Sequence, residues 1–155
     1  IYPFKIKISK SMAGILRKKT FSFSIDRDFK EVIKHCAAVN RRDQAGTWIT
    51  QDMIDAYSKL AALGYAHSVE VWQDNLLVGG LYGVLINGVF CGESMFSKVP
   101  NASKAALIFL AQKIDLRLID CQFHTPHLES MGGEYLSLTD YLAILTKDQR
   151  HEQSV

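Results

Sequence analysis

The sequence lacks the features that mark several large classes of protein. No stretch reaches the roughly 18 consecutive apolar residues of a membrane-spanning helix, and no signal-peptide pattern is present. Neither the GxxxxGK[ST] phosphate-binding loop nor the GxGxxG dinucleotide motif occurs. Internal repeats and low-complexity tracts are also missing. The sequence therefore predicts neither a membrane span nor a standard nucleotide-binding loop.

Cysteine is scarce, with three residues at wide spacings, Cys36, Cys91 and Cys121. An odd number of distant cysteines is a poor basis for a disulfide framework. It is typical of proteins from a reducing compartment. We therefore expect a cytoplasmic protein without disulfides.

The length and composition of the chain are typical of one globular domain. The 155 residues are 48% hydrophobic and 22% charged, enough for a proper core. The first residue is Ile1 and not methionine, so we expect a fragment of a longer protein. The net charge is only +2, but six basic residues precede the first acid: Lys5, Lys7, Lys10, Arg17, Lys18 and Lys19. Such a segment either binds phosphates or forms a solvated helix face.

Periodicity predicts mixed helix and strand around an antiparallel meander, an α+β fold. Asp26 or Asp28 is a candidate cap for the second helix and Thr50 for the third. Asn87-Gly88 is a hairpin signal, and Ser137 with Asp140 resembles a capping pair. Helices are expected at 10–17, from Asp26 or Asp28 to Cys36, at 50–64, 102–114 and 138–146, and strands at 4–8, 21–25, from 69 to 71, 76–86, 89–96 and 116–122.

One acid, Glu93, lies among apolar neighbours at the end of the predicted meander. Such an acid marks either a site or a structural ion pair. In a regular strand, Phe90 and Glu93 would point to opposite faces. A bulge at Gly92 would turn both into one cleft, and we expect that bulge.

A second group of polar residues follows the predicted strand at 116–122. Asp120 and Gln122 are two positions apart, so both side chains would lie on one face of a strand. They either orient a nucleophile or satisfy neighbouring backbone. Cys121, His124 and His127 have metal-like spacing, but no fourth ligand is evident and we expect no metal.

Six ordered motifs together resemble the leucyl/phenylalanyl-tRNA–protein transferases over nearly the whole chain. They are GTWIT at 46–50, GYAHSVEVW at 64–72, LVGGLYG at 77–83, FCGESMFS at 90–97, NASK at 101–104 and LIDCQ at 118–122. The resemblance implies transfer of leucine or phenylalanine, with methionine as an open further donor. The donor is charged tRNA, the acceptor is the α-amino group of a protein beginning with Lys or Arg, and the product is an N-degron.

The resemblance also implies a fold similar to the GNAT-type N-acetyltransferases, with a mostly antiparallel sheet. Residues 1–146 would form this catalytic domain and 147–155 a polar tail, and the family's smaller N-terminal domain would be missing from this chain. The donor ester is already activated, so neither ATP nor another cofactor is implied. We expect a monomer.

Site roles follow from the same resemblance. Asp120 and Gln122 would hold the acceptor amine, and Glu93 would read the acceptor's basic side chain. Trp48 would stack on the terminal adenine of tRNA. Leu81, Phe90 and Leu110 would line the pocket for the transferred side chain, and Lys10, Arg17, Lys18 and Lys19 would contact tRNA. Better-known members have Met and Phe where this chain has Leu81 and Leu110, so the donor ranking is open.

Two other functions remain as alternatives. A CoA-dependent N-acyltransferase of the same broad fold needs a glycine-rich loop at a helix N-terminus. The segment Pro100-Asn101-Ala102-Ser103 is a poor substitute for one. A non-catalytic RNA-binding module is supported by the basic segment alone.

Overall fold

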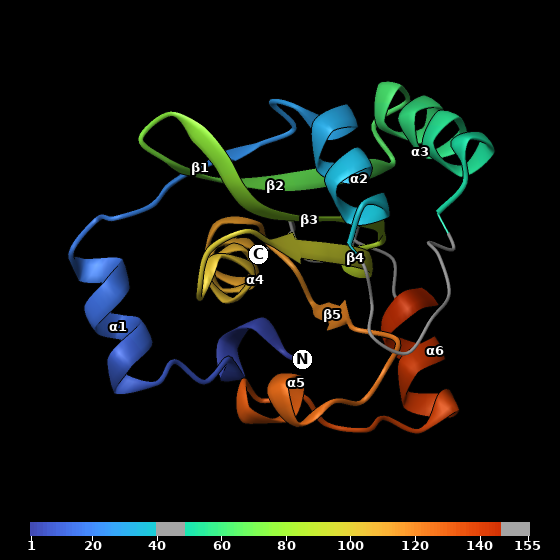
Figure 1. Ribbon diagram of the computed structural model, residues 1–155. Coiled ribbons are helices and arrows are strands. Elements are labelled where there is room, and N and C mark those ends of the chain that lie inside the picture. The colour runs from blue at the N-terminus through green and yellow to red at the C-terminus, as the bar shows by residue number, and fades with distance from the viewer. Residues whose placement is uncertain (40–48, 147–155) are drawn as a thin grey trace, which may run out of the picture.

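The computed structural model describes residues 1–39 and 49–146, which form an α+β fold. A five-stranded sheet has the strand order β1-β2-β3-β4-β5 (Figure 1). The first three pairings are antiparallel, and β4 pairs with β5 in parallel. The sheet is therefore mixed, although its pairings are mostly antiparallel as expected. The strands are β1 (Ser22–Ile25), β2 (Ala66–Gln73), β3 (Leu76–Ile86), β4 (Val89–Ser97) and β5 (Leu118–Asp120).

Helices cover both faces of the sheet (Figure 1). On one face α2 (Phe29–Ala37) and α3 (Gln51–Ala62) bury a core that includes Tyr82 and Phe96. On the other face α4 (Ala102–Lys113) packs against Leu81 and Phe90. The remaining elements are a short 3-10 helix (Pro3–Lys5), α1 (Lys10–Arg17), α5 (Pro126–Ser130) and α6 (Leu138–Thr146). None of the helices in the described ranges is both long and apolar enough to cross a membrane.

The structure confirms two helix caps and one hairpin turn that the sequence predicted. Each of these depends on only a few adjacent residues. The Thr50 side chain accepts a hydrogen bond from the Met53 backbone N–H at 3.3 Å and caps α3. Asn87 and Gly88 have φ of 48° and 75°, as a two-residue hairpin turn requires. The Ser137 hydroxyl accepts from the Asp140 N–H at 3.1 Å at the start of α6.

Two of the strands expected from the sequence differ from those in the structure. Residues 4–8 form no strand, because Pro3 begins a 3-10 helix and the following residues are irregular. The strand expected at 116–122 is only Leu118–Asp120. It ends there because Gln122 adopts a left-handed conformation, with φ of 61°. This early end has consequences for the site below.

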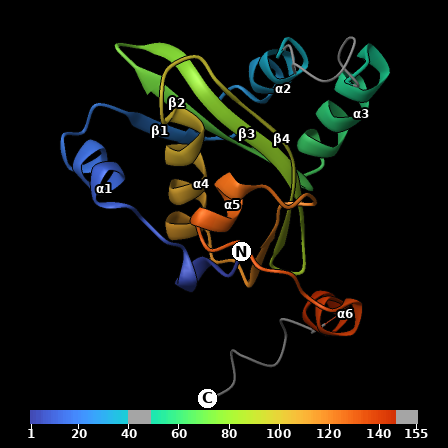
Figure 2. The same cartoon turned by 60° about the horizontal axis from the view of Figure 1, so that its bottom comes forward.

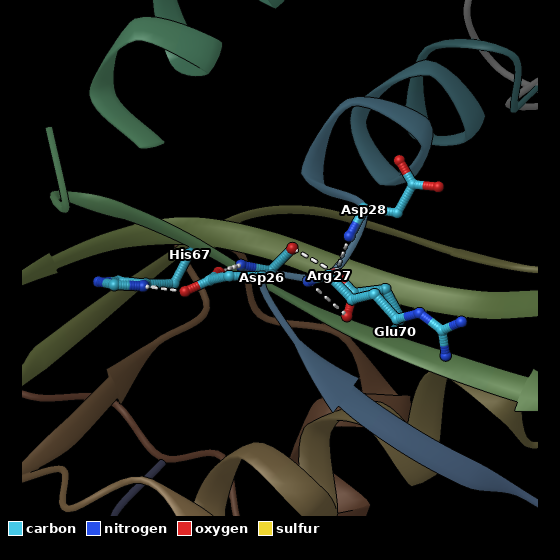
Figure 3. Close-up of polar contacts among 6 residues, drawn as sticks. Asp26, Arg27, Asp28, His67 and Glu70 are labelled. Atoms are coloured by element: carbon cyan, nitrogen blue, oxygen red, sulfur yellow. Dashed lines mark hydrogen bonds and ion pairs between the residues drawn. The ribbon is translucent and has the colours of Figure 1, made fainter. Parts of the chain in front are cut away.

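Glu70 replaces the expected cap of α2 (Figure 3). Asp28 occupies the capping position, but its side chain makes no capping hydrogen bond. Instead, the fully buried Glu70 carboxylate accepts from the backbone N–H groups of Arg27 and Asp28, at 3.3 and 3.4 Å. The hydroxyls of Ser24 and Ser68 also donate to it, each at 2.5 Å. Four donors compensate for the burial of the charge, so this acid has a structural role in joining β2 to α2.

Candidate active site

A large cavity opens where β5 ends beside β4. The two strands pair over Val89–Phe90–Cys91 with Leu118–Ile119–Asp120, after which β5 ends and β4 continues to Ser97. The cavity has a volume of about 900 Å³, within the range of small-ligand sites. Its walls come from β3, β4, α4 and the segment after β5: Leu81, Phe90, Gly92, Glu93, Ser94, Met95, Leu107, Leu110, Ile119, Asp120, Cys121, Gln122, Phe123, Thr125, His127 and Leu128.

The expected bulge in β4 is present. Tyr82 lies opposite Ser94 and Gly83 lies opposite Gly92, so Glu93 is the extra residue of the strand. One extra residue reverses the alternation of side chains beyond it. Phe90 and Met95 therefore both pack on the α4 side despite their opposite parity. Glu93 and Phe90 line the same cavity, as predicted.

The apolar wall contains the three residues predicted to line a pocket. Leu81, Phe90 and Leu110 are 3%, 1% and 0% exposed and come from β3, β4 and α4. Met95, Leu107, Ile119 and Leu128 extend this wall and were not predicted. Because the wall has no charged group, it suits an aliphatic or aromatic side chain.

Asp120 and Gln122 do lie together, but not for the expected reason. They are not on one face of a strand, since β5 ends at Asp120. The chain turns instead, and the Gln122 backbone N–H donates to Asp120 Oδ1 at 2.8 Å. The turn brings both residues to the cavity and also to a smaller one of about 350 Å³ beside it.

Glu93 contacts Tyr57 of α3, a residue that the sequence analysis did not place at the site. Burial, followed by a hydrogen bond to Glu93, raises the pKa of Tyr57 to about 12. The phenol therefore remains a donor at neutral pH. It supports the Glu93 carboxylate from α3, on the opposite side of the sheet from α4.

Tyr141 is a second residue that was missed. Its hydroxyl lies 3.7 Å from Cys91 Sγ and also hydrogen-bonds Asp120. No sequence motif connects α6 to β4 and β5, so only the fold shows this contact.

Cys121, His124 and His127 are the residues whose spacing in the sequence is typical of a metal site. His124 stacks on the Tyr135 ring at 4.9 Å, and its Nε2 lies 3.6 Å from Glu129. Among residues 1–39 and 49–146, no three His, Cys, Asp or Glu side chains are placed to hold a metal ion. Burial raises the pKa of the Cys121 thiol, so it is a weak nucleophile at neutral pH.

The predicted nucleic-acid contacts are only partly described. Lys10, Arg17, Lys18 and Lys19 are exposed on and just after α1, which lies well away from α6 (Figure 1). Trp48 lies outside the described residues.

Comparison with known proteins gives the family. The family model for "Leucyl/phenylalanyl-tRNA protein transferase" matches residues 1–146. A relative named leucyl/phenylalanyl-tRNA–protein transferase from Syntrophus aciditrophicus is 51% identical over 97% of this chain and 64% of its own length. Relatives of the same name from Flavobacterium johnsoniae and Psychromonas ingrahamii are 51% and 53% identical, over 91% and 95% of this chain and 68% and 63% of their own lengths. The chain thus spans roughly two thirds of the length of the curated relatives it matches. It belongs to the leucyl/phenylalanyl-tRNA protein transferase family.

Proposed function

We propose that this chain is the catalytic part of an aminoacyl transferase. It moves leucine or phenylalanine from charged tRNA to the α-amino group of proteins that begin with Lys or Arg, which marks them as N-degrons. The observation that carries the proposal is the β4–β5 cavity, where a neutral apolar wall meets Glu93, Asp120 and Gln122. An enzyme that joins an apolar donor to a basic acceptor needs this combination.

The apolar wall receives the donor side chain. Phe90 and Leu110 are both fully buried beside Leu81, so they already form a closed surface for a leucine or phenylalanine side chain. Such a surface distinguishes side chains by about 1–3 kcal/mol per methylene. Methionine, which is similar in size and apolar, is a further donor on this view. The ester of charged tRNA is activated before it binds, so the reaction needs no ATP.

Asp120 and Gln122 orient the acceptor amine. A free α-amino group has a pKa of about 7.7–8.0, so a useful fraction is neutral near pH 7. The attack on the ester carbonyl therefore depends mainly on orientation and one proton acceptor. The Asp120 carboxylate, held by the Gln122 N–H, accepts the amine proton directly or through water. As the new amide bond forms, the ester C–O bond breaks, and the ribose oxygen of the tRNA takes up a proton and leaves as a hydroxyl. Gln122 is a neutral amide and acts as a positioner.

Glu93 reads the positive side chain of the acceptor. It is half-buried at the bulge, and Tyr57 donates to it from α3. A charge-assisted hydrogen bond to Lys or Arg is stronger than a neutral one. This arrangement places the acceptor's first side chain on the β4 side of the cavity and its amine near Asp120.

The remaining parts of the proposal concern the whole protein. The short parallel pairing of β5 with β4, which ends beside a bulge in β4, supports a GNAT-like fold for residues 1–146. The basic residues of α1 contact the tRNA backbone, and Trp48 stacks on its terminal adenine. The enzyme acts in the cytoplasm, where its tRNA substrate is made, as a monomer.

A transfer assay tests the proposal. The full-length protein is incubated with tRNA separately charged with radiolabelled leucine, phenylalanine, methionine or arginine and with a peptide beginning with Lys. We expect label from the leucyl and phenylalanyl donors, none from the arginyl donor, and none with a peptide beginning with Glu. Asp120→Ala should abolish transfer, whereas Asp115→Ala, an exposed acid before β5, should not. Acetyl transfer from acetyl-CoA, or tRNA binding without any transfer, would instead support one of the two alternatives.

A further inference from the structure

Helix α6 stands apart from the main body of the fold (Figure 2). Its C-terminal carbonyl groups are nevertheless attached to the β4–β5 pair. Asn87, in the turn before β4, donates through Nδ2 to the Leu145 carbonyl at 2.9 Å. Arg117, just before β5, donates through Nη1 to the Ile144 carbonyl at 3.5 Å. The helix is thus docked at the end of the sheet where β4 and β5 run side by side.

Docking brings Tyr141 to the end of that strand pair. Cys91 and Asp120 lie opposite each other in the parallel β4–β5 register. The Tyr141 hydroxyl hydrogen-bonds both, with 3.7 Å between its oxygen and Cys91 Sγ. One side chain from α6 therefore contacts both residues of the last paired position of β4 and β5, at the edge of the cavity.

The directions of these hydrogen bonds follow from the chemistry of the groups. An ionised carboxylate can only accept, so the Tyr141 O–H donates to Asp120. The Tyr141 oxygen is then free to accept from the Cys91 S–H. Burial, followed by the contacts with Cys91 and Asp120, raises the pKa of Tyr141, and burial also raises the pKa of Cys91. Both groups therefore keep their protons at neutral pH.

Asp120 is held by two donors from different parts of the chain. The Gln122 N–H binds Oδ1 at 2.8 Å from within the turn, and Tyr141 binds the carboxylate from α6. A single donor on an exposed turn leaves the carboxylate free to rotate about the side-chain bonds. Two donors from separate elements determine its orientation.

We propose that Tyr141 is a positioning residue: by docking α6 on the β4–β5 pair, the protein uses the Tyr141 hydroxyl to orient the Asp120 carboxylate toward the acceptor amine. The inference rests on the proposed function, in which Asp120 serves that amine. Tyr141 is not among the residues that line the β4–β5 cavity, so we assign it no substrate contact. Its effect belongs to the chemical step, because a small misplacement of a reacting group lowers the rate even when both substrates are bound.

The test is Tyr141→Phe in the full-length protein, which removes one oxygen and keeps the ring. We expect kcat to fall about 10- to 100-fold, while the KM values for a Lys-peptide and for leucyl-tRNA stay within about two-fold. Tyr135→Phe is the matched control, since Tyr135 is 81% exposed in the preceding loop, and its kcat should equal that of the wild type. Thermal melting should show that both variants remain folded at the assay temperature.

A second variant tests the role of docking. Asn87→Gly removes the bond to α6 while keeping a residue that tolerates the positive φ of this turn. It should lower kcat in the wild type but change it by less than about two-fold in the Tyr141→Phe background, because both changes act through one contact.

Three results would overturn the inference. They are an unchanged kcat in Tyr141→Phe, a rise in KM alone, and a kcat loss that matches the loss of folded protein. In each of these cases the wild-type enzyme still transfers, and the proposed function stands. A wild-type protein that transfers from no charged tRNA would remove the proposed function and this inference together.

Discussion

Gly83 offers the sharpest test of how the cavity is built, because it lies opposite Gly92 at the β4 bulge. A Cβ atom added there would lie 2.3 Å from the backbone oxygen of Cys91 and 2.7 Å from two ring atoms of Phe90. The carbonyl belongs to the neighbouring strand and cannot rotate away. Gly83→Ala must therefore separate β3 from β4 and displace the Phe90 ring.

The size of the effect can be worked from these contacts. Overpacking a well-packed core costs about 1–3 kcal/mol, and a backbone clash belongs at the upper end of that range. For a protein of this size, a loss of about 3 kcal/mol lowers the melting temperature by about 6–12 °C. Phe90 lies in the apolar wall of the cavity, which we call the donor wall after its proposed role, so the proposal predicts that the ratio of leucine to phenylalanine transfer changes as well.

Two matched substitutions control for the change from glycine to alanine itself. Gly14 lies inside α1 with nothing within 4 Å of an added Cβ, so Gly14→Ala should raise the melting temperature by about 1–4 °C. At Gly92 the added Cβ would meet its closest neighbour, the Asp120 oxygen, at an ordinary 3.4 Å, so Gly92→Ala should be mild. Calorimetry of the three variants measures these changes in melting temperature. If Gly83→Ala melts within about 2 °C of the wild type, the β3–β4 pair accommodates an added Cβ at Gly83 and the clash argument is wrong.

Three further predictions concern the substrates, and a fourth concerns stability at high pH. Glu93→Gln should raise KM for a Lys-peptide about 10- to 100-fold, as expected for a lost charge-assisted bond, without changing tRNA affinity in a filter-binding assay; equal losses for both substrates would contradict the assigned role. Leu110→Phe should shift donor preference away from phenylalanine by about 1–3 kcal/mol, measured as the ratio of kcat/KM values, and an unchanged ratio would remove Leu110 from the donor wall. Lys18→Ala with Lys19→Ala should reduce the salt dependence of tRNA binding by about one per lost phosphate contact, whereas Lys59→Ala on α3 should leave the slope unchanged. The pKa of Tyr57 is raised to about 12, so Tyr57 ionises at a higher pH in the folded state than in the unfolded state. The stability that comes with this shift is present below about pH 10 and is lost as the pH rises toward 12. Tyr57→Phe should weaken that alkaline loss in denaturant titrations, and an identical pH profile would count against the contact with Glu93.

The polar residues outside the cavity illustrate where sequence reasoning was limited. Asp28 was a reasonable candidate cap from its position alone. The carboxylate that binds the start of α2 instead comes from Glu70, 42 residues later in the chain. Nothing in the local pattern of alternating residues distinguishes this acid from a solvated one, because its four donors meet only when β1, β2 and α2 have assembled. Figure 3 shows the two backbone donors at the start of α2.

Within the cavity, sequence reasoning predicted the residues of the donor wall and of the turn at Asp120–Gln122, but not the backbone geometry of that turn. Leu81, Phe90 and Leu110 were named from the family resemblance, and the structure brings them to one cavity. Asp120 and Gln122 were also named, but the expected regular strand was wrong. A left-handed residue other than glycine carries no clear sequence signal, so the end of β5 at Asp120 could not be predicted from propensity.

The sequence by itself determined the α+β order of elements, the hairpin at Asn87-Gly88, the cap at Thr50 and the family. These depend on neighbouring residues or on ordered motifs, which the chain carries before it folds. Only the tertiary structure decided that Glu93 is the extra residue of the bulge, that Gly83 makes room for Phe90, and that Tyr57 and Tyr141 support Glu93 and Asp120. The physical reason is that each of these contacts joins elements far apart in the chain, so its geometry is set by how strands and helices pack.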